Sequence, residues 1–297
     1  MAIPTLRNRS FFDLPPESAD DPRAPYAILP IPFERTTSYM PGTRQGPTAI
    51  LDASTQVDDY DDELQTAFDL SVQTLDMPQL DGLDDSEALA HIQRVAEAAS
   101  QESRFLLSLG GEHSITAPLV AALKKTQRVQ TVIQIDAHAD LRNEYQGTPH
   151  SHACVMRRVL ELGLNTVQVG CRSLSAEEAS LIETRNLPVL WARDLADGEI
   201  DTAKIDSAVC GPVYLSIDID ALDPSEAPGT GTPEPGGLSW YSLLKIVRHV
   251  ITTHNVVGAD IVEVAPIAGM AVTEFLAARL AVKVLLYHSR KGGPARG

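Results

Sequence analysis

Short apolar runs alternate with amphipathic segments along most of the chain. Seven runs rich in Val, Ile and Leu predict strands at Tyr26–Ile31, Arg104–Leu109, Thr131–Ile135, Thr166–Gly170, Val189–Trp191, Val213–Asp218 and Val256–Glu263. The segments between them predict helices at Ser86–Ala99, Thr116–Lys124, Ala153–Leu162, Ala176–Thr184, Tyr241–Thr252 and Thr273–Tyr287. We expect Ser86 and Ser239 to act as N-caps of the first and fifth of these helices.

This alternation predicts an α/β protein with three layers, α/β/α, around a mostly parallel central sheet. We expect one domain over residues 1–297. Proline-rich sequence predicts an irregular N-terminal arm over about the first 25 residues, and the stretch from Lys291 onward predicts a short frayed tail. In such sheets, ligands bind outside the carboxyl ends of the strands, so these ends are the first place to look for chemistry.

Residues that commonly bind metal ions follow three of the predicted strands. Asp136-Ala137-His138-Ala139-Asp140 follows one strand, Asp218-Ile219-Asp220 ends a second, and Gly110-Gly111-Glu112-His113-Ser114 follows a third. If the extended geometry continues, positions 136, 138 and 140 point the same way, because strand side chains alternate between faces. Together the three segments offer four Asp and two His side chains at one edge of the sheet.

Each of these residues also has an ordinary structural explanation. A single Asp after a strand is usually a cap or a turn residue, and a single His is usually a hydrogen-bonded polar group. Four carboxylates at neighbouring strand ends, however, repel one another strongly unless cations neutralise them. The set of Asp and His ligands therefore predicts a site for two divalent ions, and this mixture of oxygen and nitrogen ligands favours Mn²⁺.

Composition limits the classes of function. The chain has a net charge of −16, which argues against nucleic-acid binding and is compatible with a cationic substrate. Its three cysteines are scattered, which indicates a reducing compartment rather than a disulfide framework. The sequence contains no apolar stretch of membrane-spanning length, and Met1-Ala2-Ile3-Pro4 does not open a signal peptide. We therefore expect a cytoplasmic protein without membrane contact.

The three metal-binding segments together resemble the motifs of the ureohydrolase family, the arginases and agmatinases, which hydrolyse guanidino groups to urea. Three further segments extend the resemblance, and they are Gly42–Pro47, the glycine-rich stretch Ala227–Leu238, and Asp260–Pro266. The match covers most of the chain with the motifs in the family's order, and it is strongest to bacterial-type agmatinases. The resemblance implies an arginase-like fold and a small guanidino substrate.

The resemblance also implies a role for each metal-binding residue. One Mn²⁺ would be held by His113, Asp136, Asp140 and Asp218, and the other by His138, Asp136, Asp218 and Asp220. Asp136 and Asp218 would then bridge the two ions. Two ions that share a water lower its pKa, which makes hydroxide available near neutral pH. Asp140 is expected to orient this nucleophile as a catalytic residue.

Three other residues are expected to serve catalysis or substrate binding. By resemblance, Glu263 binds the substrate guanidinium, because carboxylate and guanidinium form paired hydrogen bonds. His152 is expected to pass a proton to the leaving amine. Ala153 departs from the family pattern, which often has Gly after this histidine. His150 is expected to be either a second histidine of the substrate pocket, which we favour, or a solvent-exposed loop residue.

The substrate tail is predicted from two segments. Leu141–Thr148 does not match the arginase pattern that binds an α-carboxylate, and Val169–Ser175 resembles agmatinases. We therefore expect hydrolysis of agmatine to putrescine and urea, a step of polyamine biosynthesis. The alternatives are a guanidinobutyrase or other guanidino-acid hydrolase, then an arginase. From other classes, a one-zinc deacetylase and a non-catalytic homologue stay open. The resemblance further implies a homotrimer or homohexamer.

Overall fold

Eight parallel strands form the central sheet of the computed structural model, which describes residues 10–100, 104–195 and 200–291. The strand order is β4-β1-β5-β10-β9-β6-β7-β8, and every neighbouring pair is parallel. The strands are β1 (Tyr26–Ile31), β4 (Val72–Thr74), β5 (Phe105–Gly110), β6 (Thr131–Ile135), β7 (Asn165–Cys171), β8 (Val189–Trp191), β9 (Val213–Asp218) and β10 (Val256–Val262). All seven predicted strands are present, which confirms the mostly parallel sheet.

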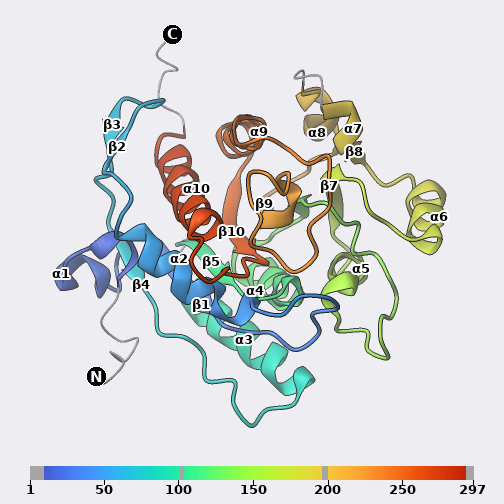
Figure 1. Cartoon of the computed structure of the whole chain (residues 1–297), viewed down its shortest axis with the longest axis horizontal. Helices are drawn as coiled ribbons and strands as arrows, with labels where there is room; N and C mark the ends of the chain where they lie inside the picture. The colour runs from blue at the N-terminus through green and yellow to red at the C-terminus, as the bar shows by residue number, and fades with distance from the viewer. Residues whose placement is uncertain (1–9, 101–103, 196–199, 292–297) are drawn as a thin grey trace.

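Helices cover both faces of this sheet and complete the three layers (Figure 1). One face packs against α2 (Gly46–Ser54), α7 (Ala192–Leu195), α8 (Thr202–Ala208), α9 (Trp240–Thr253) and α10 (Val272–Ser289). The other face packs against α3 (Asp85–Ala99), α4 (Thr116–Gln127), α5 (Val155–Glu161) and α6 (Ala176–Arg185). Alternate residues of β1 enter the two cores, with Ile28 in the first and Leu29 in the second, as the two-residue strand repeat requires.

Several short elements were not expected from the sequence. They are the edge strand β4, the helix α2, the antiparallel pair β2 (Tyr60–Asp61) and β3 (Thr66–Ala67), and the short helices α7 and α8. The N-terminal arm is also more regular than expected, because it contains a 3-10 helix at Phe11–Asp13 and α1 at Pro16–Ala19. Phe11 is fully buried, and its N–H donates to Thr74 Oγ1. The described part of the arm therefore holds two short helices between irregular stretches and packs on the core, and residues 1–9 lie outside the described chain.

The predicted cap of α3 is wrong, whereas the predicted cap of α9 is confirmed. Asp84, not Ser86, caps α3, because its side chain accepts from Glu87 N while the Glu87 side chain accepts from Asp84 N. This reciprocal pair is a capping box, and it satisfies two N–H groups that the helix leaves unpaired. Ser239 caps α9 by accepting from Ser242 N. Of the predicted C-terminal tail, only Lys291 lies within the described residues.

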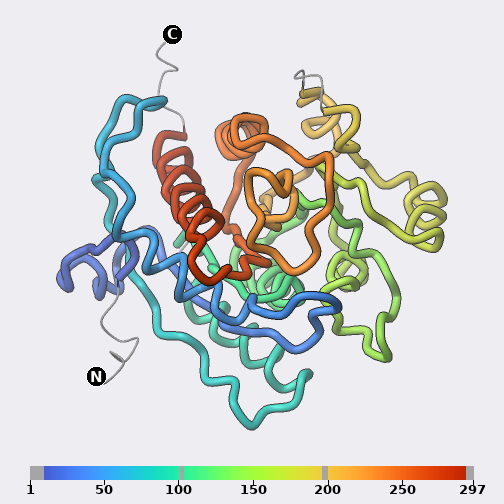
Figure 2. The backbone as a smooth tube through the Cα atoms, viewed as in Figure 1, coloured from blue at the N-terminus to red at the C-terminus, as the bar shows by residue number. Residues whose placement is uncertain are grey.

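Two loops meet over the carboxyl edge of the sheet. The segment 32–45 follows β1, and the glycine-rich segment 227–238 follows β9. Met40 N donates to Gly231 O and joins them, and Figure 2 shows the two stretches of the tube side by side. Gly111 allows the first loop to approach closely, because a Cβ at this position would lie 2.0 Å from Phe33 O. These loops therefore frame the edge at which the predicted metal ligands lie.

Candidate metal centre and active site

Four adjacent strands bring the predicted site residues to one edge of the sheet. In the order β5-β10-β9-β6, the strands end next to His113, Glu263, Asp218 and Asp136, respectively. Because all four strands are parallel, their carboxyl ends point the same way and these side chains converge. The remaining predicted ligands, His138, Asp140 and Asp220, follow β6 and β9 within a few residues.

Three carboxylates surround one nitrogen of His113. Its Nδ1 lies 3.0 Å from Asp136 Oδ2, 3.1 Å from Asp140 Oδ2 and 3.3 Å from Asp218 Oδ2. The strand β6 ends at Ile135, and Asp140 has a positive φ of 51°, so the extended geometry expected through position 140 does not persist. Asp140 nevertheless reaches the cluster. A left-handed backbone at a non-glycine residue is strained and is often found at functional sites.

A chain of buried hydrogen bonds fixes the ring of His113. Ser216 Oγ donates to Asp260 Oδ1 at 2.7 Å and lies 2.9 Å from His113 Nε2. Since the only hydroxyl proton of Ser216 goes to Asp260, His113 Nε2 must carry the proton that it donates to Ser216. Nδ1 is then the nitrogen that faces the three carboxylates. Burial lowers the pKa of His113, but Asp136, Asp140 and Asp218 outweigh it and raise that pKa well above the usual value, so that Nδ1 also carries a proton in the metal-free protein. A metal ion that binds Nδ1 would displace this proton. Asp260 thus acts behind a metal ligand rather than as one.

A second cluster lies beside the first. His138 Nδ1 is 3.0 Å from Asp220 Oδ2 and 3.7 Å from Asp136 Oδ1. Asp136 therefore offers one oxygen to each cluster, as expected of a residue that bridges two ions. Asp218 offers Oδ2 to the first cluster, while its Oδ1 accepts from Asp220 N at 2.9 Å. Its bridging role stays a prediction.

The buried atoms and the charges of this centre fit a pair of divalent cations. His113 Nδ1 and Asp220 Oδ2 are buried, and neither makes a well-aligned hydrogen bond in the described part of the chain, although each faces a side chain of opposite character at 3.0 Å. Burial, reinforced by the charges of Asp220 and Asp136, raises the pKa of Asp218 well above its usual range. Buried polar atoms without well-aligned partners and packed carboxylates both cost free energy. Divalent ions held by these residues would remove both costs.

Glu263 joins the metal centre to the predicted proton donor. Its Oε1 accepts from His113 N at 2.7 Å and lies 3.5 Å from His152 Nδ1. Glu263 also has a positive φ of 63°, and its N–H donates to Gly111 O. Among the described residues, no group donates to its other oxygen, Oε2. Glu263 is therefore held firmly through one oxygen and keeps a second acceptor for a ligand.

His152 is held at its backbone and has one free ring nitrogen. Its N–H donates to Thr36 Oγ1 at 2.9 Å, while Nε2 is buried and has no partner among the described residues. Burial by itself lowers the pKa of His152, but the carboxylates of Glu263, Asp140 and Glu112 outweigh burial and raise that pKa to about 9. In the metal-free protein, His152 is therefore a cation near neutral pH, and it has a proton to give.

A pocket of about 220 Å³ opens over this centre. Its walls include His138, Asp140, Asp218, Asp220, His152, Arg142 and Tyr145. His150 is not among the lining residues of this pocket. It lines a different pocket together with residues of α3, α4 and α5, such as Leu89, Ala121 and Arg158. Glu263 and His113 are likewise not among the residues that line the 220 Å³ pocket, so the expected role of His150 in substrate binding stays a prediction.

Two supporting residues of the site were not assigned a role from the sequence. Glu112 is fully buried, and it accepts hydrogen bonds from the N–H groups of Arg35 and Thr36 and from the hydroxyls of Thr36 and Ser114. It anchors the segment 32–45 beside His152. The guanidinium of Arg172 donates to carbonyl oxygens of Asp220, Ala221, Leu222, Glu234, Pro235 and Gly170. It fixes the turn that carries Asp220. Both residues lie in quoted motifs, but most of their partners are distant in sequence.

Among the described residues, no helix is both long enough and apolar enough to cross a bilayer.

Comparisons with known proteins agree with this geometry. The family model described as Arginase family matches residues 24–287. The N(1)-aminopropylagmatine ureohydrolase of Synechocystis sp. is 44% identical over 89% of this chain and 89% of its own. The agmatinase of Pyrococcus horikoshii is 36% identical over 86% of this chain and 88% of its own. The crystal structure of the agmatine ureohydrolase of Thermoplasma volcanium superposes with a TM-score of 0.80 at 30% identity, covering 92% of this chain and 93% of that one.

Proposed function

The chain belongs to the arginase family and is a ureohydrolase, and we propose that it hydrolyses an agmatine-type substrate, a guanidino group on an alkylamine without a carboxylate. The observation that carries this proposal is the arrangement of Glu263 and His152 beside the two His–Asp clusters. It supplies a guanidinium-binding carboxylate and a proton donor next to a metal centre. Relatives whose names specify a substrate of this kind support an alkylamine without a carboxylate as the rest of the substrate.

We propose that two Mn²⁺ ions occupy the centre. His113, Asp136, Asp140 and Asp218 would hold the first ion, and His138, Asp136, Asp218 and Asp220 the second. When bound, the ions supply a strong nucleophile from water near neutral pH. Carboxylate oxygens and imidazole nitrogens are suitable ligands for Mn²⁺. The buried atoms His113 Nδ1 and Asp220 Oδ2, which make no well-aligned hydrogen bond among the described residues, support this assignment.

We assign the remaining steps of the reaction to individual residues of the chain. Glu263 would accept hydrogen bonds from the guanidinium through Oε2 and hold its carbon over the centre. Asp140 would orient the attacking water by accepting a hydrogen bond from it. The water would lose one proton to solvent on activation, and its oxygen would add to the guanidinium carbon. The remaining hydroxyl proton would pass to Asp140 as the bond from that carbon to the alkyl nitrogen breaks, which leaves the oxygen as the carbonyl of urea. His152 would give a proton to the leaving nitrogen, so that the products are urea and an amine.

The pocket disfavours a substrate with an α-carboxylate. Arg142 is a permanent cation on the pocket wall that could pair with such a group, but its Nε lies 3.8 Å from Glu178 Oε2. Its guanidinium also stacks on the ring of Tyr145 at 4.8 Å. A substrate carboxylate would have to compete with these contacts or remain unpaired, and an unpaired buried charge is costly. An alkylamine without a carboxylate avoids this cost.

Within this class, we place N(1)-aminopropylagmatine ahead of the expected agmatine. The relative at 44% identity is named for the former, whereas the relative named agmatinase is 36% identical. A urea-release assay with Mn²⁺ over several substrates tests both the substrate class and the choice of substrate within it. It should compare kcat/KM for N(1)-aminopropylagmatine, agmatine, arginine, guanidinobutyrate and guanidinopropionate. A higher value for arginine or a guanidino acid would overturn the substrate class while leaving the family assignment intact.

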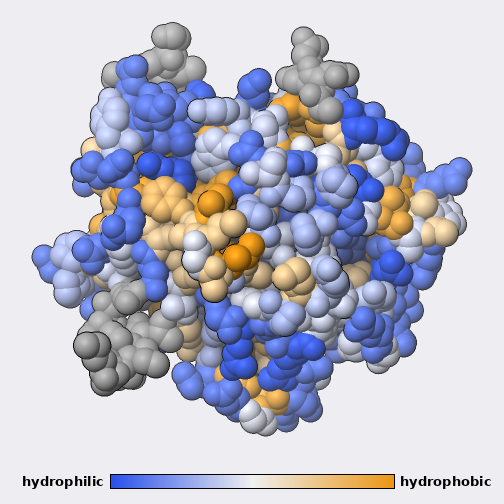
Figure 3. Space-filling model, in the orientation of Figure 1, coloured by the Kyte–Doolittle hydropathy of each residue, from blue (hydrophilic) through white to orange (hydrophobic). Residues whose placement is uncertain are grey.

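We also propose a homotrimer or homohexamer, as the resemblance implied. Tyr241, Val272 and Phe275 are exposed large side chains that share one groove of the surface. Figure 3 shows hydrophobic residues gathered on this face, over the start of α10 and the loop before it. Exposed apolar patches of this kind commonly mark contacts between chains. Light scattering tests the assembly, and a stable monomer at working concentration would contradict it.

A further inference from the structure

A third group of metal-binding side chains lies at the opposite end of the sheet. Asp206 belongs to α8, His249 to α9, and His254 caps the end of α9. His254 precedes β10 and Glu263 follows it, so the length of the strand separates this group from the active centre. Seven residues at a rise of about 3.3 Å make this separation roughly 20 Å. The group cannot contact the same substrate.

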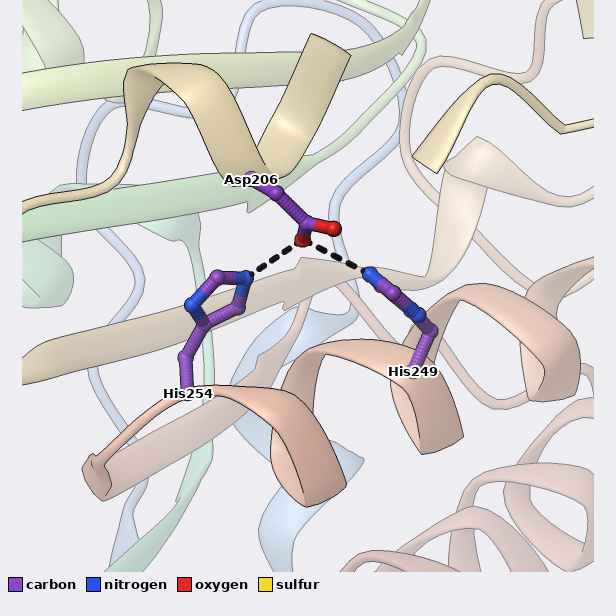
Figure 4. Close-up of side chains that lie close together, drawn as sticks. All are labelled: Asp206, His249 and His254. Atoms are coloured by element: carbon purple, nitrogen blue, oxygen red, sulfur yellow. Dashed lines mark hydrogen bonds and ion pairs between the residues drawn. The ribbon is translucent and has the colours of Figure 1, made fainter. Parts of the chain in front are cut away.

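The three side chains converge on one point. His249 Nε2 and His254 Nε2 each lie 2.8 Å from the same oxygen, Asp206 Oδ1. The two rings are nearly perpendicular, at 80°, with centroids 6.1 Å apart. Figure 4 shows both rings directed at the carboxylate from neighbouring turns at the end of α9. A main-chain hydrogen bond from His254 N to Val250 O fixes the second ring's backbone.

These distances are close to those of a metal site. Zn²⁺ binds imidazole nitrogen and carboxylate oxygen at about 2.0–2.2 Å. Two such ligand atoms 2.8 Å apart form an angle of about 90° at an ion placed at those distances, and a shift of about half an ångström brings them to tetrahedral spacing. Two imidazoles and one carboxylate are also a typical ligand set for Zn²⁺, with a further position left for water.

We propose that Asp206, His249 and His254 form a Zn²⁺ site separate from the active centre. The site is accessible, because the side chains of Asp206, His249 and His254 are 38%, 24% and 12% exposed. His249 also lines a groove of about 820 Å³ between α9 and the β2–β3 segment. The ion would tie α8 to the end of α9, and its distance from Glu263 separates it from the ureohydrolase reaction.

A pair of hydrogen bonds is the competing explanation. Each ring could carry its proton on Nε2 and donate it to Asp206, without any ion. Asp206→Asn separates the two explanations. An asparagine keeps an oxygen that accepts from both rings, but it loses the negative charge that a Zn²⁺ ligand supplies. The metal site predicts at least a tenfold loss of Zn²⁺ affinity in this variant, whereas the hydrogen-bond pair alone predicts no Zn²⁺ binding to lose.

The experiment measures Zn²⁺ binding to the Mn²⁺-loaded enzyme. Zn²⁺ per chain is determined by elemental analysis, and affinity by competition with a chromophoric chelator, in the wild type and in Asp206→Asn, His249→Gln and His254→Gln. His91→Gln is the matched control, because His91 lies on a helix and has no hydrogen bond or ion pair among the described residues. Any exchange of Zn²⁺ into the active centre affects all variants equally, so the difference between proteins reports this site.

The wild type and His91→Gln should bind one Zn²⁺ per chain more than His249→Gln and His254→Gln. Added Zn²⁺ should raise the thermal midpoint of the first pair further than that of the second, because an ion that binds only the folded state stabilises it. Urea release with Mn²⁺ should be equal in all five proteins. Equal Zn²⁺ stoichiometry in the wild type and both histidine variants would overturn the proposal and leave two hydrogen bonds in its place.

Discussion

Glu263 accepts a hydrogen bond from the main-chain N–H of His113 at 2.7 Å, across 150 positions of sequence. The residue proposed to bind the guanidinium is thus fixed to the residue proposed to bind the metal. If both roles hold, the backbone N–H of His113 fixes the carboxylate of Glu263, and thus the guanidinium that it would bind, relative to the centre. It also explains how Glu263 can remain well placed even though its backbone is strained.

The link predicts a specific result for Glu263→Gln. Glutamine keeps an oxygen to accept from His113 N but loses the charge that pairs with the guanidinium. Hydrogen bonds to charged groups contribute about 1.5–3 kcal/mol, so kcat/KM should fall roughly 10- to 100-fold or more. Elemental analysis should show unchanged metal content. Glu177→Gln, at an exposed position on α6, is the control. Unchanged kinetics in Glu263→Gln would rule out the guanidinium role.

Asp136 gives a separate prediction about the metals. Because its two oxygens face different clusters, Asp136→Asn should weaken the binding of both ions. Urea release should be lost, and metal content should fall below two ions per chain. The exposed Asp81→Asn variant should behave as the wild type. Full occupancy together with normal turnover in Asp136→Asn would contradict the binuclear assignment, and chelation of the wild type should abolish activity in the same assay.

Much of this site was predictable because its chemistry is local in sequence. The motif from Asp136 to Asp140 and the pair Asp218 and Asp220 directly follow apolar strands, and parallel strands place their ends together. The same logic identified seven of the eight strands. It missed β4, because a three-residue edge strand has too few positions to show a period. It misplaced the cap of α3, because Asp84 and Ser86 are both good caps and only the reciprocal bond with Glu87 decides between them.

The supporting residues were harder to predict for a different reason. Ser216 orients His113 across 103 positions, and Arg172 donates to carbonyls 48 to 63 positions away. Such contacts depend on the assembled sheet, and no local pattern marks them. The position of His150 was similarly hard to predict. Sequence proximity to His152 suggested a shared pocket, but the turn at Ser151 starts a 3-10 helix and the two histidines line different pockets.

The two histidines of this segment should differ sharply when each is replaced. His152→Asn should lower kcat by about 10²- to 10⁴-fold, the usual contribution of general acid–base catalysis. His150→Asn should leave kcat nearly unchanged, because His150 lies outside the site pocket. Metal content should be normal in both proteins. A greater loss in His150→Asn than in His152→Asn would show that the proton donor has been assigned to the wrong residue.

The titration of His152 provides a pH test. In the metal-free protein, nearby carboxylates, Glu263 foremost, raise the pKa of His152 to about 9, although burial lowers it. The imidazolium should therefore persist well above the ordinary histidine pKa of about 6.5. Glu263→Gln removes the main opposing influence, so burial should then move the pKa of His152 downward by a unit or more. NMR titration of the His152 ring in both proteins measures this shift. An unchanged pKa of His152 in Glu263→Gln would show that the Glu263 carboxylate does not raise it.

Ser216 should control metal affinity rather than turnover. Its hydroxyl is fully buried between His113 Nε2 and Asp260 Oδ1. Ser216→Ala leaves the Nε2–H of His113 without an acceptor and frees the ring to shift its proton to Nδ1, the atom that should bind the ion. Loss of such a partner behind a metal ligand typically weakens metal binding about 10- to 100-fold.

The unmet hydrogen bond should also lower the free energy of unfolding by about 1–3 kcal/mol. At saturating Mn²⁺, kcat should recover to near the wild-type value, because Ser216 does not line the substrate pocket. Metal titration of activity and denaturant unfolding measure the two effects. Thr166→Val is the matched control, since it removes a buried strand hydroxyl that has no hydrogen-bond partner among the described residues. If Ser216→Ala bound Mn²⁺ as tightly as Thr166→Val, His113 would not depend on this hydroxyl for its orientation.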